Sequence, residues 1–251
     1  MTSDTPGGAA HRASPAGLLA GLLALVTAAC QPAEPARAAV VDDEIDDEIL
    51  EGLEGAADGA DPCASHPGGP LSGDDLLVII SKEEGRQLEA GWEAPDLVPV
   101  DGAFMMPGRD GVARLAAVEA FHELADAARV EADLDLGLRS AYRSFARQCF
   151  TFNYKVEVNG EEHANQYSAR PGRSEHQLGT ALDITSARLG WQVEDFIGEE
   201  PEGIWLAENA HRFGFGLSYP RGYEEQTGYG YEPWHWRYIC LLYTSPSPRD
   251  Q

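Results

Sequence analysis

The sequence predicts a domain of the α+β class, with a small antiparallel sheet flanked by helices. Helical and strand-like segments are interspersed along the chain, but the repeating strand–helix–strand order of a parallel sheet is missing. The strand-like runs are also short, which favours a small sheet. A chain of 251 residues is long enough for one such domain with appendages.

The first half of the predicted domain contains one clear helix. A short apolar run at residues 74–83 suits a strand, whereas prolines interrupt residues 91–100, which we expect to be irregular. Residues 109–132 are rich in alanine, and apolar side chains recur there at steps of three and four between Val118 and Ala128. This stripe predicts an amphipathic helix.

The second half alternates between strand and helix patterns. Residues 133–142 alternate leucine with polar or small residues, the period of a half-buried strand, and residues 143–156 indicate a helix that follows it. Residues 179–186 predict another strand. Residues 202–220 predict a helix stopped by a glycine and followed by a short strand, and residues 232–239 a final strand.

The first thirty residues are typical of a secretory signal. The apolar run at residues 16–30 follows His11 and Arg12, is too short to span a bilayer, and closes on small residues. Cys30, directly after them, resembles the acceptor site of a bacterial lipoprotein. We therefore expect an exported protein of the periplasm or cell envelope, attached to the membrane only through a lipid on Cys30. A plain signal peptide with an incidental cysteine is the alternative.

The charge distribution excludes one class of partner and marks a linker. The formal net charge is −24, which argues against nucleic-acid binding, because phosphates require a basic surface. Residues 42–61 are rich in aspartate and glutamate and contain no lysine or arginine. We therefore expect residues 31–61 to be a disordered acidic linker and residues 62–239 to form the folded domain, as a monomer.

The last residues, 240–251, fit no element of this domain. One reverse translation of residues 240–250 resembles a transposase adapter used in sequencing libraries. We therefore expect the native reading to end at Ile239 and residues 240–251 to be a sequencing-adapter artefact. Of the four cysteines, Cys63 and Cys149 then remain. In an exported protein two such thiols suit a disulfide, and two unpaired buried thiols are the alternative.

A histidine and an aspartate flank a glycine near the centre of the domain. His176 and Asp183 lie seven positions apart, which would send them to opposite faces of a regular strand. Gly179 between them permits a turn, so a histidine on a loop can meet an aspartate on a strand. Asp183 alternates with Leu182 and Ile184 and must therefore lie on the other face, where a carboxylate has to be solvated, paired or bound to metal.

The chain's final strand offers a second pair. Pro233 breaks the local period, so Glu232 and His235 can converge despite their spacing. Two histidines and one aspartate suit zinc with one position open for water, on one face of the sheet. Glu232 is then a nearby carboxylate that can serve as general base. A structural zinc site is the alternative, and it would require four protein ligands.

Three segments resemble the zinc D-alanyl-D-alanine carboxypeptidases of the VanY type, whose superfamily includes lysostaphin-type peptidases and the hedgehog signalling domain. SEHQLGTALD at 174–183 matches the pattern Ser-x-His-x-x-Gly-x-Ala-x-Asp. EPWHWRY at 232–238 matches the Glu-x-x-His element, and SAYRSFARQ at 140–148 matches a Ser-x-Tyr-Arg-Ser segment, with Ala141 where the family typically has glycine. The resemblance covers roughly residues 74–239.

The resemblance implies a role for each matched residue. His176, Asp183 and His235 would be the Zn²⁺ ligands, and Glu232 would be the general base. Arg143 would stabilise the oxyanion or hold the substrate's terminal carboxylate; an ion pair with a surface acid is its alternative. Two further residues, Gln148 and Ser174, would hydrogen-bond substrate, and a turn or cap role is the alternative for Ser174.

The implied activity is hydrolysis of the C-terminal D-alanine of peptidoglycan stem peptides. An L,D-carboxypeptidase acting on tetrapeptide stems is a close alternative, because the choice of bond depends on the shape of the pocket. A non-catalytic cell-wall-binding module of the same fold is a second alternative. Such a module has no need of Glu232, so the presence of this residue favours an enzyme.

Overall fold

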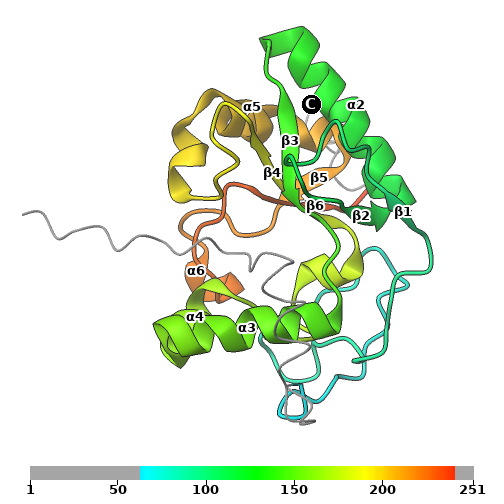
Figure 1. Cartoon of the computed structure of the whole chain (residues 1–251), viewed down its shortest axis with the longest axis vertical. Coiled ribbons are helices and arrows are strands. Elements are labelled where there is room, and N and C mark those ends of the chain that lie inside the picture. Colours follow the sequence, from blue (N-terminus) through cyan, green and yellow to red (C-terminus); the bar gives the residue numbers. More distant parts are fainter. Residues whose placement is uncertain (1–62, 241–251) are drawn as a thin grey trace, which may run out of the picture. The chain divides into compact units, whose positions relative to one another are not determined.

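The computed structural model describes residues 63–240 (Figure 1). The predicted signal with Cys30, the acidic linker at 31–61, the first residue of the expected domain and residues 241–251 lie outside this range. No helix within the described part combines the length and apolar character needed to cross a membrane.

Helices and strands are interspersed along the chain, as expected. The strands are β1 (Leu97–Pro99), β2 (Val112–Arg114), β3 (Leu136–Ser140), β4 (Ala181–Ser186), β5 (Phe215–Leu217) and β6 (His235–Tyr238). The α-helices are α2 (Leu115–Ala132), α3 (Phe145–Asn159), α4 (Glu161–Tyr167), α5 (Pro201–Asn209) and α6 (Glu224–Thr227). Three 3₁₀ turns are η1 (Glu175–Leu178), η2 (Asp195–Glu199) and η3 (Ala210–Phe213).

Four strands form the main sheet, in the order β3-β4-β6-β5, and every neighbouring pair is antiparallel. The antiparallel α+β prediction is therefore confirmed. Asp183 on the central strand β4 is opposite Ser140 of β3 on one side and His235 of β6 on the other. A register shift between Leu138 and Ser140 bends β3 and sets Ser140 beside Asp183. The sheet thus aligns three polar residues across its strands.

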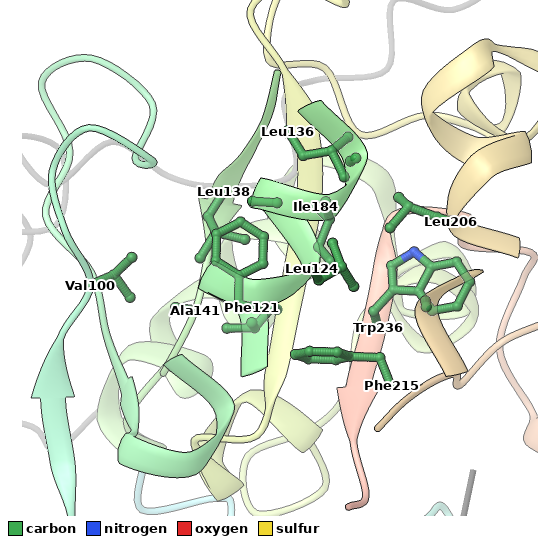
Figure 2. Close-up of a cluster of buried hydrophobic side chains, with 14 of the residues drawn as sticks. Val100, Phe121, Leu124, Leu136, Leu138, Ala141, Ile184, Leu206, Phe215 and Trp236 are labelled. Carbon is green, nitrogen blue, oxygen red and sulfur yellow. The ribbon is translucent and has the colours of Figure 1, made fainter. Parts of the chain in front are cut away.

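The hydrophobic core fills one face of this sheet. Side chains of helix α2 and helix α5 belong to this core, and Figure 2 shows Phe121 and Leu124 of α2 directed toward Leu138 and Ile184 of the sheet. The residues predicted as the helical stripe, Val118, Phe121, Leu124, Ala125 and Ala128, are all buried. Because Leu182 and Ile184 belong to the core, Asp183 between them lies on the other face.

The prediction of a strand at residues 74–83 is wrong. The chain turns there instead, because the Asp75 side chain accepts a hydrogen bond from the Leu77 amide (2.9 Å) and the Val78 amide bonds back to the Asp75 carbonyl (3.0 Å). Nη2 of Arg237 donates to the carbonyl oxygens of Leu76 (2.9 Å) and Val78 (2.7 Å). A side chain therefore satisfies backbone groups that a neighbouring strand would otherwise pair.

Two boundaries also differ from expectation. Residues 91–100 are not wholly irregular, since β1 lies within them and pairs with β2. The same pairing shortens the helix predicted at 109–132, which begins only at Leu115. The sequence pattern did not predict this two-stranded sheet, which has three residues per strand. Strands this short are stabilised by pairing with each other, and they are too short to show a clear alternation of apolar and polar residues.

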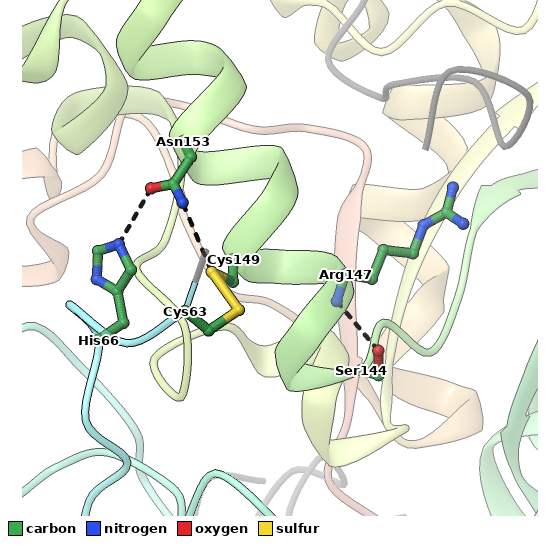
Figure 3. Close-up of a disulfide and its surroundings, with 6 residues drawn as sticks. All are labelled: Cys63, His66, Ser144, Arg147, Cys149 and Asn153. Carbon is green, nitrogen blue, oxygen red and sulfur yellow. Dashed lines mark hydrogen bonds between the residues drawn. A yellow bond between two sulfur atoms is a disulfide. The ribbon is translucent and has the colours of Figure 1, made fainter. Parts of the chain in front are cut away.

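A disulfide joins Cys63 to Cys149, which lie 86 positions apart in sequence and have their Cα atoms 5.7 Å apart (Figure 3). The predicted pairing is confirmed. Cys149 is fully buried on α3, so the bond fixes the start of the described chain to this helix. His66, three residues later, contacts Oδ1 of Asn153 on the same helix at 3.1 Å.

Candidate functional site

A sharp turn brings His176 to the sheet. His176 lies in η1, and Gly179, which ends this turn, has φ +70°, a left-handed conformation that favours glycine. A Cβ at Gly179 would also lie 2.9 Å from a Leu97 side-chain carbon. The chain can then enter β4, which carries Asp183. The predicted turn at Gly179 and the convergence of His176 with Asp183 are both observed.

A second tight turn brings Glu232 beside His235. The His235 amide donates to the Glu232 carbonyl oxygen at 3.1 Å, with Pro233 between them, and β6 begins at His235. One oxygen of Glu232 lies 3.8 Å from Nδ1 of His235. The two residues therefore converge as expected.

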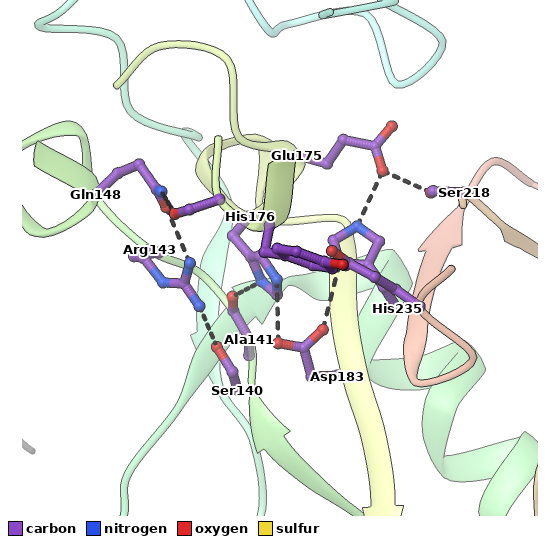
Figure 4. Close-up of polar contacts among 12 residues, drawn as sticks. Ser140, Ala141, Arg143, Gln148, Glu175, His176, Asp183, Ser218 and His235 are labelled. Carbon is purple, nitrogen blue, oxygen red and sulfur yellow. Dashed lines mark hydrogen bonds and ion pairs between the residues drawn. The ribbon is translucent and has the colours of Figure 1, made fainter. Parts of the chain in front are cut away.

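His176, Asp183 and His235 meet on the open face of the sheet (Figure 4), and one possible ligand atom from each lies within 4.8 Å of the others. Nε2 of His176 is 3.2 Å from Oδ2 of Asp183, and Nδ1 of His235 is 3.3 Å from Oδ1 of Asp183. All three side chains are buried. Within residues 63–240 no fourth histidine, cysteine or carboxylate belongs to this group.

Hydrogen bonds fix the orientation of both imidazoles. Nδ1 of His176 is 2.5 Å from the Ala141 carbonyl oxygen, which can only accept, so Nδ1 carries a proton, and Nε2 is directed at Asp183. Nε2 of His235 likewise lies 3.0 Å from a Glu175 carboxylate oxygen, and its Nδ1 faces Asp183. Donating the outer N–H in this way is characteristic of histidines that bind metal.

The donor set fits a cation. Nε2 of His176 and Nδ1 of His235 both face the negative carboxylate of Asp183, an arrangement that suits a positive charge between them. Oδ1 of Asp183 is buried and accepts no hydrogen bond from the described residues. Two imidazoles and one carboxylate suit zinc among the common metals, and three protein ligands are typical of a catalytic zinc site rather than a structural one.

The electrostatics of the metal-free chain agree with this fit. Burial raises the pKa of Asp183, but the two imidazoles outweigh burial and hold the pKa well below its usual range. Burial lowers the pKa of His235, but the neighbouring carboxylates of Asp183 and Glu175 outweigh it and raise the pKa to about 10. A proton on His235 thus occupies the position that a metal ion would take.

Glu175 is a member of the site that the sequence analysis missed. Besides His235, its carboxylate accepts from Oγ of Ser218 (2.5 Å) and from Nη1 of Arg237 (3.0 Å). Burial raises the pKa of Glu175, but these partners outweigh it and lower the pKa to about 2. One sequence signal could have indicated Glu175. Arg237 lies two residues after His235 in a strand, so both side chains lie on the same face, and a buried cation there requires a nearby carboxylate.

Arg143 lies at the side of the metal-ligand set (Figure 4). Its Nη1 donates to Oε1 of Gln148 at 2.9 Å, and its Nη2 donates to Oγ of Ser140 at 3.3 Å. Gln148 is fully buried, and its amide nitrogen donates to the Ala169 carbonyl at 2.7 Å. Gln148 therefore orients Arg143, and its predicted contact with substrate stays a prediction.

All seven predicted site residues line one cleft of about 530 Å³. Ser174 is buried there directly before η1, and its side chain makes no capping hydrogen bond, so the cap alternative finds no support. Val193 and Trp234 line the cleft as well. The rest of the wall comprises Ala169 and five polar residues: Lys155, Tyr167, Ser168, Tyr219 and Tyr229.

The fold and the site define a class of mixed α/β proteins with a His/Asp/His centre on an antiparallel sheet. Residues 112–241, just over half of the chain, match the VanY family, described as D-alanyl-D-alanine carboxypeptidase. The chain belongs to this family, as its three motifs indicate. The matched segments span between 31% and 60% of the length of the curated relatives.

Similar proteins come from both sequence and structure. YodJ of Bacillus subtilis (strain 168) is 36% identical over 168 residues, which make up 66% of this chain and 60% of YodJ. The LdcB LD-carboxypeptidase structure is 34% identical, with a TM-score of 0.64 over 68% of this chain and 80% of that one. A variant of the vancomycin-resistance D,D-pentapeptidase VanY, in complex with Zn(II), is 27% identical, with a TM-score of 0.54 over 68% of this chain and 90% of that one.

Proposed function

We propose that this chain is a zinc metallocarboxypeptidase that removes the C-terminal D-alanine from peptidoglycan stem peptides. The observation that carries the proposal is the buried His176–Asp183–His235 set, with no fourth described ligand and with Glu232 beside it. Family membership and the Zn(II) complex of the VanY relative support the same activity and metal.

The chain's own residues have distinct roles in this reaction. When bound, zinc supplies a Lewis acid that polarises the scissile carbonyl and lowers the pKa of water. Glu232, whose side chain is 13% exposed, lies beside the ligands without belonging to their group. It is placed to take a proton from the attacking water and to return it to the leaving amine. The burial of the ligands excludes bulk water and strengthens these interactions.

Arg143 recognises negative charge in the same cleft. Ser140 and Gln148 hold its guanidinium in one orientation, so its binding geometry exists before the substrate arrives. We assign to it the substrate's terminal carboxylate or the developing oxyanion. Ser174, buried in the same wall, is placed to hydrogen-bond the peptide.

A second candidate is cleavage of tetrapeptide stems by L,D-carboxypeptidase activity. The similarity to the LdcB LD-carboxypeptidase favours it. The experiment that separates the two candidates gives the zinc-loaded full-length chain matched pentapeptide and tetrapeptide stems and measures D-alanine release by mass spectrometry. We expect faster release from the pentapeptide. Faster release from the tetrapeptide would support the second candidate, and no release from either would contradict the proposed function.

The place of action is a further part of the proposal. The signal-like residues 16–30 and the lipoprotein-like Cys30 support an exported protein anchored at the cell envelope. Replacing Cys30 with alanine should move the protein from the membrane fraction to the soluble fraction of an expressing bacterium. Unchanged fractionation would contradict the lipid anchor.

A further inference from the structure

Lys82 lies at the surface of the segment that precedes residues 112–241, the part of the chain that matches the VanY family. Its ammonium group nevertheless joins two distant parts of the chain. Nζ of Lys82 donates hydrogen bonds to the carbonyl oxygens of Asn165, in α4, and of Gly228, directly after α6. Figure 1 shows α6 beside α4. Lys82 therefore connects three segments that are far apart in sequence.

The turn at Gly228 is packed against this lysine. Gly228 has φ +78°, a left-handed conformation that favours glycine, and a Cβ there would lie 3.0 Å from Cδ of Lys82. Lys82 thus contacts the turn through its aliphatic stem as well as through its ammonium group. The residues that follow this turn, Tyr229 and Glu232, line the catalytic cleft.

A row of packed rings leads from the ammonium group to the metal-ligand set. Nζ of Lys82 lies 3.9 Å from the ring centroid of Tyr229, a cation–π contact. The rings of Tyr229 and Tyr219 have their centroids 4.9 Å apart, and the rings of Tyr219 and His235 have theirs 4.8 Å apart. Close-packed side chains transmit displacements to their neighbours. The position of Lys82 is therefore coupled to that of the cleft wall.

The same row of rings is tied to the backbone of Glu232. The Glu232 amide donates to the Tyr219 carbonyl oxygen at 3.1 Å, and Glu232 follows Tyr229 by three positions. The Tyr229 hydroxyl is buried and has no hydrogen-bond partner among residues 63–240, so the contacts of its ring hold this side chain in place. Burial lowers the pKa of Lys82, and the charge of Glu232 opposes this shift, so the two groups are close enough to interact.

We propose that Lys82 is a positioning residue for the general base. It fixes the turn at Gly228 and the ring of Tyr229, and thereby holds Glu232 in place beside His235. This inference rests on the proposed function and adds to it a residue from outside the family-matched part of the chain. A misplacement of about 1 Å can cost about 100-fold in rate, so a contact away from the reacting atoms can affect the chemical step.

The kinetic test replaces Lys82 with methionine, which keeps an unbranched stem but removes the ammonium group. In the zinc-loaded full-length chain, kcat for D-alanine release from a pentapeptide stem should fall by about tenfold, because Glu232 acts in the chemical step. KM and bound zinc should stay near their wild-type values. Lys82→Arg keeps a cation over the Tyr229 ring and should recover most of the lost kcat.

Arg86→Met is the matched control, because Arg86 lies in the same segment and its side chain is exposed. This variant should keep the wild-type kinetics. An unchanged kcat in Lys82→Met would overturn the inference. An equal loss of kcat in Arg86→Met, or a loss of bound zinc in Lys82→Met, would also overturn it, because either result would indicate a general effect on the segment or the fold.

Hydrogen exchange separates this inference from the proposed reaction, because it requires no turnover. The Gly228 amide donates to the Glu224 carbonyl oxygen at 2.8 Å, and the Tyr229 amide donates to Oγ1 of Thr227 at 3.2 Å. In zinc-loaded Lys82→Met these two amides and that of Glu232 should exchange about tenfold faster than in the wild-type chain, whereas the amides of β4 should be unchanged.

The two measurements have distinguishable outcomes. Faster exchange in Lys82→Met but not in Arg86→Met would support the positioning role even if the wild-type chain released no D-alanine. Release of D-alanine by the wild-type chain, with the same exchange rates in wild type and Lys82→Met, would support the reaction and overturn the positioning role.

Discussion

Glu175 and Arg237 form a buried ion pair directly behind His235, with Nη1 of Arg237 and Oε1 of Glu175 3.0 Å apart. The other Glu175 oxygen accepts from Nε2 of His235 at 3.0 Å. The pair therefore sets which nitrogen of His235 faces Asp183. A metal ion bound on one side of the imidazole would therefore depend on a salt bridge on the other side.

Replacing Glu175 with glutamine should weaken zinc binding by about 10–100-fold, because the carboxylate that orients His235 is lost. Competition against a chromophoric chelator measures this affinity. Ser218→Ala, which removes only one hydrogen bond to Glu175, should have a smaller effect. Since Glu175→Gln also leaves Arg237 buried without its charge partner, a melting curve should accompany the measurement. Unchanged affinity in a folded Glu175→Gln chain would show that the orientation of His235 does not depend on this carboxylate.

Zinc binding should release about one proton at pH 7–8. In the metal-free chain the pKa of His235 is raised to about 10, so the imidazole is protonated at neutral pH and must lose that proton to bind metal. Below this pKa the apparent affinity should fall about tenfold for each unit of decreasing pH. Calorimetry in two buffers with different ionisation enthalpies counts the proton. A binding enthalpy independent of the buffer would refute the prediction.

Arg143→Lys should lower kcat/KM by about 100-fold although it preserves the positive charge, because an ammonium group cannot reproduce the planar fork held by Ser140 and Gln148. Steady-state kinetics on the pentapeptide stem provides the measurement. Arg129→Lys, far from the cleft, is the control. If Arg143→Lys kept the wild-type kcat/KM, the contribution of Arg143 would come from its positive charge alone and not from the planar geometry of its guanidinium group.

Glu202 on α5 should stabilise the fold in a pH-dependent way. Its carboxylate accepts from Ser186 (2.7 Å) and from Nε of Arg188 (2.9 Å). Burial raises the pKa of Glu202, but these partners outweigh it and lower the pKa below the ordinary value of 4.5. A lowered pKa means that the stabilisation is complete above pH 4.5 and is lost as the pH falls through the folded-state pKa.

Glu202→Gln should therefore reduce the free energy of unfolding by about 1–2 kcal/mol at pH 7, a modest value because Arg188 is half exposed. Urea denaturation at pH 7 and pH 3 tests this, and the difference from wild type should shrink at pH 3. Glu208→Gln, exposed on the same helix, is the control. An equal loss at both pH values would indicate that packing, not charge, gives Glu202 its effect.

The sequence predicted that His176 meets Asp183 and that Glu232 meets His235 because local constraints determine each pair. Gly179 forces a turn between His176 and Asp183, and Pro233 forces another before His235, so each half of the site follows from a few adjacent residues. The core stripe of α2 follows equally from periodicity. The pairing of β4 with β6 joins the two halves of the site. This contact is long-range, and the sequence motifs indicated it, whereas the periodicity of the strands did not.

The sequence did not predict features that depend on distant partners. Glu175 next to His176 resembles any surface acid until Arg237, 62 positions away, is placed against it. The apolar run at 74–83 has strand-like composition, but the same Arg237 donates hydrogen bonds to two of its backbone carbonyl oxygens, which a neighbouring strand would otherwise pair. The register shift that sets Ser140 beside Asp183 likewise arises only when β3 pairs with β4.

The most direct test of the catalytic account compares the zinc-loaded full-length chain with its Glu232→Gln variant, measuring bound zinc and D-alanine release from a pentapeptide stem in the same samples. We predict equal zinc content and a loss of release of about 10²–10⁴-fold, because Glu232 moves the proton without holding the metal. Release at the wild-type rate from a variant that retains its zinc would contradict the account.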